Sequence, residues 1–425
     1  MADGVRQPVL GLVSWLTAAP WRAFLLIFLV HVGFQAILPR EVPPWYLLPH
    51  SPMEVPAAAL ALYERGELAD PYTLPTGPTA HMPPFQPALM AAIYLLLGPT
   101  LAAGYATWLI AVGFYGIMYG MLPWLASRLG LRPEAGFVGG LVGALIPRWP
   151  GFAEALAAVA IGLMLAAFLR RWETRRGTSR GSFVLGLAIG VSFHVTPSLL
   201  PVALGLVTFE LLWLQEPQRR RWAALTLLGM TLACVPWTWR NYTSLGGLLF
   251  IRSNFGLELR MGNHEGAGLT LEQSVRGGTE RHPGSSEEEA RKVQQFGELQ
   301  YMRQAGREAV EWIRSHPATF LRLTGMRIVQ FWFGPVDDRP FAIWISLVTL
   351  LSAVGAWRAL PLLSVPQRVA ILIPLVTYPL VYYLVGFEAR YREPMDGLSL
   401  LLAATAFFAP FRLRMAAGAL SMPVE

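Results

Sequence analysis

Charged residues are scarce in this chain of 425 residues. Asp, Glu, Lys and Arg make up 14% of it and 54% is hydrophobic, whereas a soluble globular protein has about 25% charged residues. Lys292 is the only lysine and Cys234 the only cysteine. A single cysteine excludes an intrachain disulfide framework and a site built from several thiolates.

The low charge comes from repeated apolar runs of roughly 20 residues, the length that crosses a bilayer as a helix. They predict an all-α polytopic membrane protein with about ten transmembrane helices, because backbone in lipid must satisfy its own hydrogen bonds. The first run is long for a signal-peptide core and lacks a small-residue cleavage site, so we interpret it as a retained span. The predicted spans are 21–38, 101–125, 135–148, 153–169, 182–194, 197–214, 222–238, 341–357, 368–386 and 394–411.

Two further apolar helices, 86–98 and 317–334, are short or interrupted, and we expect them to lie in the membrane interface or to re-enter it. Gly186 and Gly190 indicate a place where two helices pack closely. No internal repeat is visible, which argues against a transporter built from inverted repeats.

Arginines in the connecting loops predict the orientation. Residues 170–180 hold five arginines and 219–221 three; Arg412 and Arg414 follow the last span, and Arg358 and Arg368 bracket another loop. With ten spans, all lie on the side of the N-terminus, which the positive-inside tendency makes cytoplasmic. The same placement argues against nucleic acid as a partner, despite a net charge of +7. We therefore expect a multi-pass protein of the cytoplasmic (inner) membrane.

Two polar segments then lie outside. We divide the chain into an N-terminal transmembrane core (1–238) with a proline-rich first outer loop (39–85), an extracytoplasmic segment (239–340) and C-terminal transmembrane helices (341–425). The outer segment should be small and α-rich. Its clearest helix is predicted from Ser286 to Ser315, with glutamates at its start and His316-Pro317 at its end.

Glu54 in the first outer loop has two interpretations. Ser51-Pro52-Met53-Glu54 fits a capping box, with Ser51 as the N-cap of a helix that ends near Gly66. Pro56 weakens the pattern because it removes a backbone donor just inside the helix. A functional carboxylate is the alternative, and position alone favours the capping role.

Two other acids lie near the predicted outer face. Glu154 follows Pro147-Arg148-Trp149-Pro150-Gly151 at a span end, where it is either a functional carboxylate or the ion-pair partner of Arg148. Asp70 precedes Pro71, which is typical of a turn, and ranks third among the candidate acids.

Four arginines break the positive-inside tendency. Arg390 and Arg392 lie in a short outer turn, and Arg240 and Arg148 at outer span ends. The planar guanidinium binds phosphate oxygens bidentately, so a phosphate site at this face is one interpretation. Ion pairs with Glu388 or Glu393 are the other.

Among the histidines, His81 and His194 fall near the outer face, where either could donate to a phosphate or a sugar. No pair has metal-ligand spacing on a helix, such as His-Glu-x-x-His. We assign no metal and no cofactor; a divalent ion held by Glu54 and Glu154 is conceivable, but nothing in the pattern supports it.

Motifs spread over almost the whole chain resemble one family. In the first outer loop they are Glu54 at a helix start, Leu62-Tyr63-Glu64-Arg65-Gly66, Ala69-Asp70-Pro71-Tyr72 and Thr76-Gly77-Pro78-Thr79-Ala80-His81. Later come Pro236–Tyr242, Arg252–Glu258, Gly262-Asn263, His282-Pro283, Phe296-Gly297-Glu298 with Tyr301, His316-Pro317 before Phe331-Trp332, and Ala389–Pro394. Together they resemble bacterial membrane glycosyltransferases of the C superfamily, which includes protein O-mannosyltransferases and the aminoarabinose transferases of lipid A.

The resemblance implies transfer of a hexose or pentose from a polyprenyl-phosphate carrier to an extracytoplasmic acceptor, which could be a glycan, a lipid or a protein. It places Glu54 at the position of the family's catalytic carboxylate, the base of an inverting transfer. Met53 departs from the acidic pair common there, so Glu54 is either the base or an orienting group. Glu154 would be a second catalytic acid. Arg390, Arg392, Arg240 and Arg148 would bind the phosphate of the leaving group, and His81, His194 and Asp70 would contact substrate.

Two other functions stay open. A membrane transporter or lipid flippase would place ionisable groups near mid-membrane, where these spans have almost none. A non-catalytic scaffold whose outer segment binds a partner protein is opposed only by the resemblance and by Glu54.

Overall fold

The computed structural model describes residues 11–39, 42–147, 151–174, 177–270, 273, 282–335 and 337–408. Within these ranges the protein is built from α-helices and short 3-10 turns, and it contains no strand, only two isolated bridges. The predicted all-α membrane fold is confirmed.

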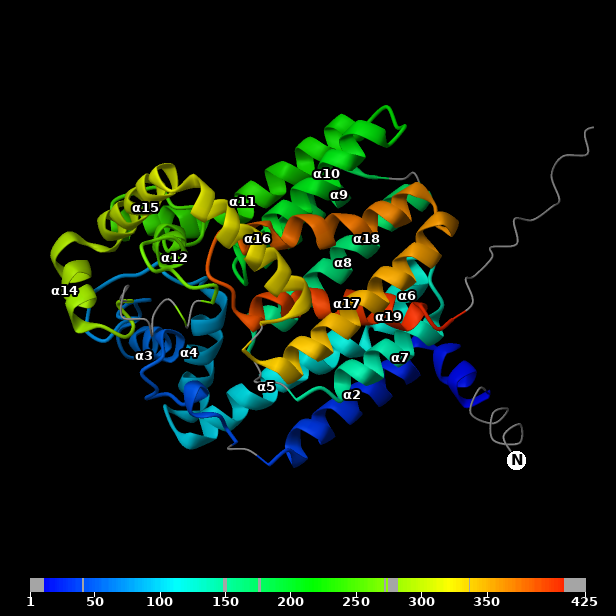
Figure 1. Cartoon of the computed structure of the whole chain (residues 1–425), viewed down its shortest axis with the longest axis horizontal. Helices are drawn as coiled ribbons and strands as arrows, with labels where there is room; N and C mark the ends of the chain where they lie inside the picture. The colour runs from blue at the N-terminus through cyan, green and yellow to red at the C-terminus, as the bar shows by residue number, and fades with distance from the viewer. Residues whose placement is uncertain are drawn as a thin grey trace, which may run out of the picture.

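Each predicted span overlaps a helix, although the second half of 368–386 is the 3-10 turn η4 (Tyr378–Val381) and a loop; the helices that match the spans are labelled in Figure 1. They are α2 (Pro20–Ile37), α5 (Leu101–Gly120) continued by α6 (Leu122–Arg128), α7 (Pro133–Ala144), α8 (Ala153–Thr174), α9 (Ser179–Ser192), α10 (Leu200–Trp213) after the 3-10 turn η2 (Pro197–Leu199), α11 (Arg219–Leu245), α17 (Arg339–Ala359), α18 (Val365–Thr377) and α19 (Glu393–Thr405). Of the described helices, α2, α5 with α6, α8, α11 and α17 with η3 (Leu360–Leu362) are long and apolar enough to cross a membrane. The count of ten spans stays a prediction.

Helix α19 lies at the centre of the bundle. Every residue from Pro394 to Thr405 is buried, and the helix packs against α7, α8 and α17. Close packing elsewhere depends on glycine: a Cβ on Gly186 of α9 would lie 2.1 Å from the Thr226 carbonyl of α11, and one on Gly190 would lie 2.6 Å from that of Met230. The predicted close helix contact is therefore confirmed between α9 and α11.

The two polar segments gather at one end of the bundle, at the left of Figure 1. We call the described residues of 42–97 and 246–316 the head. It contains α3 (Glu54–Arg65), α4 (Phe85–Leu97), α12 (Phe255–Gly262), α14 (Glu287–Phe296) and α15 (Glu298–Ser315). Both segments contribute to one small core, made by Tyr72, Leu257, Met261, Ala290, Val293, Tyr301 and Met302. The first loop is thus a structural part of the later segment.

Several boundaries differ from the sequence predictions. The helix expected from Ser286 to Ser315 is broken at Gly297, which has a φ of +79° and separates α14 from α15. Glycine allows this break because it adopts positive φ without a Cβ clash. Helix α11 continues to Leu245, past the proposed domain boundary at 238/239. The two extra apolar helices are present as α4 and α16 (Pro317–Phe333).

Candidate functional site

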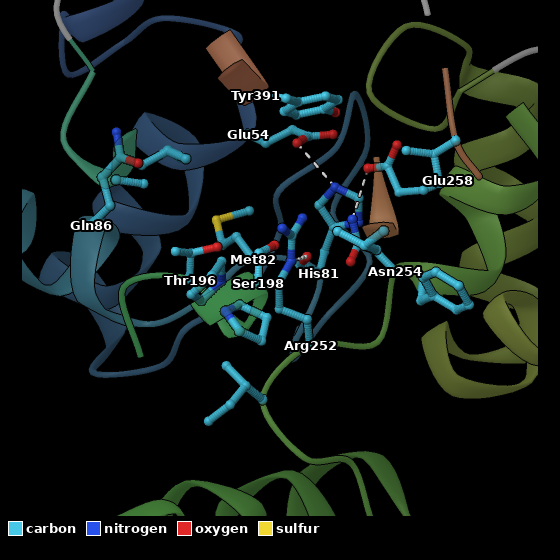
Figure 2. A pocket seen from close by; sticks show the side chains of 18 of the residues that line it. Glu54, His81, Met82, Gln86, Thr196, Ser198, Arg252, Asn254, Glu258 and Tyr391 are labelled. Carbon is cyan, nitrogen blue, oxygen red and sulfur yellow. Dashed lines mark hydrogen bonds and ion pairs between the residues drawn. The ribbon is translucent and has the colours of Figure 1, made fainter. Parts of the chain in front are cut away.

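Glu54 is the first residue of α3, and its side chain does not cap the helix. The N-cap is Met53, and the Ser51 hydroxyl accepts only the Met53 N–H, at 3.3 Å. The predicted capping box is therefore wrong, because the helix begins two residues later than that motif requires. Instead, Glu54 Oε2 accepts a hydrogen bond of 3.0 Å from His81 Nε2 (Figure 2). Glu54 Oε1 lies 3.5 Å from His282 Nδ1.

The three side chains form an electrostatically coupled group. Partial burial alone would raise the Glu54 pKa, but His81, His282 and Arg252 outweigh it and lower the pKa to about 2. Burial opposes the charge on His81, which is 2% exposed, yet the Glu54 carboxylate raises the His81 pKa. The pKa of His282 is lowered, mainly by burial. Glu54, whose side chain is 29% exposed, is therefore an ionised acceptor at neutral pH.

These residues line a cavity of about 680 Å³ between the head and the bundle. Its polar lining residues include Glu54, His81, Gln86, Glu154, Thr196, Ser198, Arg252, Asn254, Glu258, His282, Tyr382, Arg390 and Tyr391. Its apolar lining residues include Val195, Pro197, Leu200, Pro201, Phe250, Val381 and Val385. A cavity lined by both charged and apolar side chains suits a ligand that carries both a charged group and an apolar chain.

Arg252 enters the cavity beside His81. Its Nε donates to the His81 carbonyl at 2.9 Å, and among the described residues no carboxylate is within ion-pair distance of it. Its two terminal nitrogens make no hydrogen bond to those residues, so they are available to an anionic ligand. Arg252 begins the Arg252–Glu258 motif, but no pattern in the sequence marked it as a phosphate-binding residue.

Arg390 also lines the cavity, from the 3-10 turn η5 (Ala389–Arg392) just before α19. Arg390 Nε donates to Glu388, and the guanidinium lies 5.5 Å from the centre of the Tyr391 ring. The neighbouring Glu388 raises the pKa of Arg390 further above its ordinary value, so this side chain stays charged. Glu154, in the first turn of α8, lines the same cavity.

Glu258 and Asn254 form a third polar group of the wall. Asn254 Nδ2 donates to Glu258 Oε1 at 2.8 Å across one turn at the start of α12 (Figure 2). Residues four apart share a helix face, and this spacing could have indicated the pair. His282 lies in a loop before α14 and belongs to the His282-Pro283 motif of the resemblance, but no local pattern indicated that its side chain would lie beside Glu54.

The cavity brings together four of the predicted residues: Glu54, Glu154, His81 and Arg390. Arg148 lies outside the described residues. Arg392, 2% exposed, faces away from the cavity and pairs with Asp396 of α19.

Three further candidates are not lining residues. Arg240 donates to the carbonyls of Thr79 at 2.7 Å and Leu68 at 2.8 Å, so it holds the first loop. His194 Nδ1 donates to the Gly190 carbonyl at 3.2 Å. Asp70 has a φ of 53° and accepts from the Gly77 N–H at 2.7 Å, as expected of a turn former.

A metal ion fits the first group only in part. Ligand atoms of Glu54, His81 and His282 all lie within 4.8 Å of one another. However, the Gly284 N–H donates to His282 Nδ1 at 3.0 Å and so occupies its lone pair. His81 Nδ1 is buried and has no partner among the described residues, whereas a metal-bound histidine usually donates its second N–H to a fixed acceptor. We therefore derive no step through a metal.

Comparison with known proteins finds no matching family model and no matching curated sequence. Two solved structures of the Archaeoglobus fulgidus oligosaccharyltransferase share the fold. One is AglB in complex with an inhibitory peptide and a dolichol-phosphate, with a TM-score of 0.50 and 14% identity. The other is the apo enzyme, with a TM-score of 0.53 and 15% identity.

Each comparison covers 92% of this chain but only 50% and 51% of the respective archaeal chain, so this protein spans about half their length. At this identity the likeness defines the fold alone. It does not distinguish among the glycosyltransferases that the sequence resembles.

Proposed function

We propose that this chain is a membrane glycosyltransferase that moves a sugar from a polyprenyl-phosphate carrier to an acceptor on the outer side of the cytoplasmic membrane. The observation that carries the proposal is one cavity in which an ionised carboxylate, Glu54, shares space with two guanidinium groups, Arg252 and Arg390. The fold shared with an oligosaccharyltransferase, and the dolichol-phosphate bound to that protein, support it.

Glu54 acts on the acceptor. In an inverting transfer the acceptor hydroxyl attacks the anomeric carbon and loses its proton as the new carbon–oxygen bond forms. The attacking oxygen becomes strongly acidic at that stage, so even a carboxylate of low pKa can take the proton. His81 holds the Glu54 carboxylate in place through its Nε2 hydrogen bond. Glu154 supplies a second carboxylate for hydroxyl groups of the acceptor or the sugar.

Arg252 and Arg390 act on the donor. Cleavage of the sugar–phosphate bond leaves negative charge on the lipid phosphate, and fixed guanidinium groups stabilise that charge without reorganisation. The apolar lining residues Pro197, Leu200 and Val381 contact the first units of the lipid chain.

A transfer assay tests the proposal. The purified full chain receives radiolabelled polyprenyl-phosphate sugars together with membrane extract as the source of acceptor. Glu54→Gln should lower the rate by roughly 100-fold or more, the usual contribution of a positioned base. Glu64→Gln is the matched control, since Glu64 is an exposed carboxylate on the same helix.

Two results would overturn the proposal: no donor loses its sugar to any acceptor, or Glu54→Gln transfers as fast as the wild type. A lipid flippase, the rival function, would bind and move the lipid phosphate without breaking the sugar–phosphate bond. Intact donor recovered after incubation with functional, donor-binding protein would therefore favour the rival.

A further inference from the structure

Glu298 is a buried carboxylate just outside the cavity, at the first position of α15. It is 4% exposed, and no Lys, Arg or His lies within ion-pair distance of it among the described residues. Its Oε1 accepts the Ala80 N–H at 2.8 Å and the Ser253 hydroxyl at 2.7 Å, while its Oε2 accepts the Thr79 hydroxyl. A buried ionised group is costly unless its hydrogen bonds are made, and here neutral donors alone make them.

The donors come from two segments that each carry a basic side chain of the cavity. Ala80 directly precedes His81, and Ser253 directly follows Arg252. The segments also bond to each other: Ser253 N–H donates to the Ala80 carbonyl at 2.9 Å, and Arg252 Nε donates to the His81 carbonyl at 2.9 Å. Glu298 joins the same two segments and is not among the residues that line the cavity.

We propose that Glu298 is a positioning residue that sets the separation between His81, which orients the base Glu54, and Arg252, which binds the donor phosphate. This role rests on the proposed function. It makes the positions of both His81 and Arg252 depend on Glu298, the first residue of α15. Glu298 touches neither substrate and acts through its hydrogen-bonded neighbours.

The two carboxylate oxygens of Glu298 accept hydrogen bonds from different hydroxyl groups, Oε2 from Thr79 and Oε1 from Ser253. The Thr79 hydroxyl donates to Glu298 and accepts the backbone N–H of His81 at 3.0 Å. The bond between Thr79 and Glu298 therefore fixes the position of the His81 backbone. Ser253 is the only hydroxyl donor on the Arg252 side among the described residues. Loss of the Thr79 link should therefore disturb chemistry, and loss of the Ser253 link should disturb donor binding.

Steady-state kinetics of the full chain with variable donor separate the two effects. Thr79→Val should lower kcat by roughly tenfold with the donor KM near that of the wild type. Ser253→Ala should raise the donor KM by roughly tenfold with kcat little changed. Glu298→Gln, which places an amide N–H against one of the three donors, should change both constants.

Glu308→Gln is the control, because Glu308 lies on the same helix, pairs with Arg260 and has no link to the cavity. Its kinetic constants should match those of the wild type. Thermal unfolding of every variant is measured in parallel, since a purely structural role would lower stability and activity together without separating KM from kcat.

Equilibrium binding of a short-chain polyprenyl phosphate gives a second readout that needs no turnover. Ser253→Ala should weaken this binding and Thr79→Val should not. The inference is overturned if both variants change the same constant, or if Glu298→Gln behaves as Glu308→Gln does. A wild-type protein that binds the lipid phosphate but transfers no sugar would instead overturn the proposed function, and the binding data would still test the Ser253 link.

Discussion

Arg252 and Arg390 reach the same cavity with different partners, and this difference predicts unequal effects of the same substitution. Arg390 donates to Glu388, whereas Arg252 has no carboxylate partner among the described residues. Arg252→Gln removes a phosphate donor and the Nε hydrogen bond to the His81 carbonyl, but it leaves no carboxylate without its cation. Arg390→Gln removes a donor and also leaves the Glu388 carboxylate without its cation beside the anionic ligand.

The magnitudes follow from the charges. A hydrogen bond to a charged group contributes about 1.5–3 kcal/mol, so either substitution should weaken lipid-phosphate binding by roughly 10- to 150-fold. Repulsion between Glu388 and the phosphate adds to the loss at Arg390. Since the Arg390 side chain is 57% exposed and that of Glu388 29%, water screens the repulsion to about 1 kcal/mol, or roughly fivefold.

Equilibrium binding of a short-chain polyprenyl phosphate to the purified full chain measures these differences. Arg390→Gln should bind about fivefold more weakly than Arg252→Gln, and adding Glu388→Gln to the Arg390 variant should recover that factor. Glu388→Gln alone should leave thermal unfolding unchanged, because an exposed ion pair contributes about 0–1 kcal/mol. Equal losses at the two arginines with no recovery would refute the reasoning, as would unchanged binding in either single variant.

Three other outcomes are expected. Arg240→Gln should speed amide hydrogen exchange across residues 68–80, because two carbonyls lose a charged donor worth about 1.5–3 kcal/mol each; a loss confined to donor affinity would contradict this. Burial raises the pKa of Glu289, but Lys292, Tyr301 and Arg260 outweigh burial and lower this pKa below the ordinary 4.5. The ionised Glu289 therefore stabilises the fold above pH 4.5, and this stabilisation is lost as the pH falls below that value. Exchange in α14 and α15 should rise there, and Glu289→Gln should remove that dependence. Chelator-treated protein should keep its transfer rate within about twofold, since His81 lacks the supporting acceptor of a metal ligand; restoration by one added metal would contradict this.

The helices were predictable because hydropathy is a property of contiguous residues. Runs such as 101–125 and 153–169 fall within α5 with α6 and within α8, respectively. Breaks within a helical pattern were harder to predict from the sequence. A single glycine, Gly297, ends one helix and starts another through its positive φ, and composition around it is strongly helical on both sides.

The site was predictable only in part, because its members come from distant positions. Local pattern favoured a capping role for Glu54, and the family resemblance favoured the cavity-lining one. Its neighbour His282 is brought to it by tertiary packing that no local signal encodes. Arg240 and Arg252 carry the same charge, yet both terminal nitrogens of Arg240 donate to backbone carbonyls, whereas Arg252 uses only its Nε in this way among the described residues.

The shared core of the head has a consequence for the order of synthesis. Tyr72 of the first loop packs against Leu257, Ala290 and Met302, which the ribosome adds much later. Until those residues emerge, Tyr72 lacks its apolar partners, whereas the part of the loop around Val55 and Ala59 can already pack against α4 and α5. Maturation of the protein should therefore include a late step in which an already made loop is closed by the newest part of the chain.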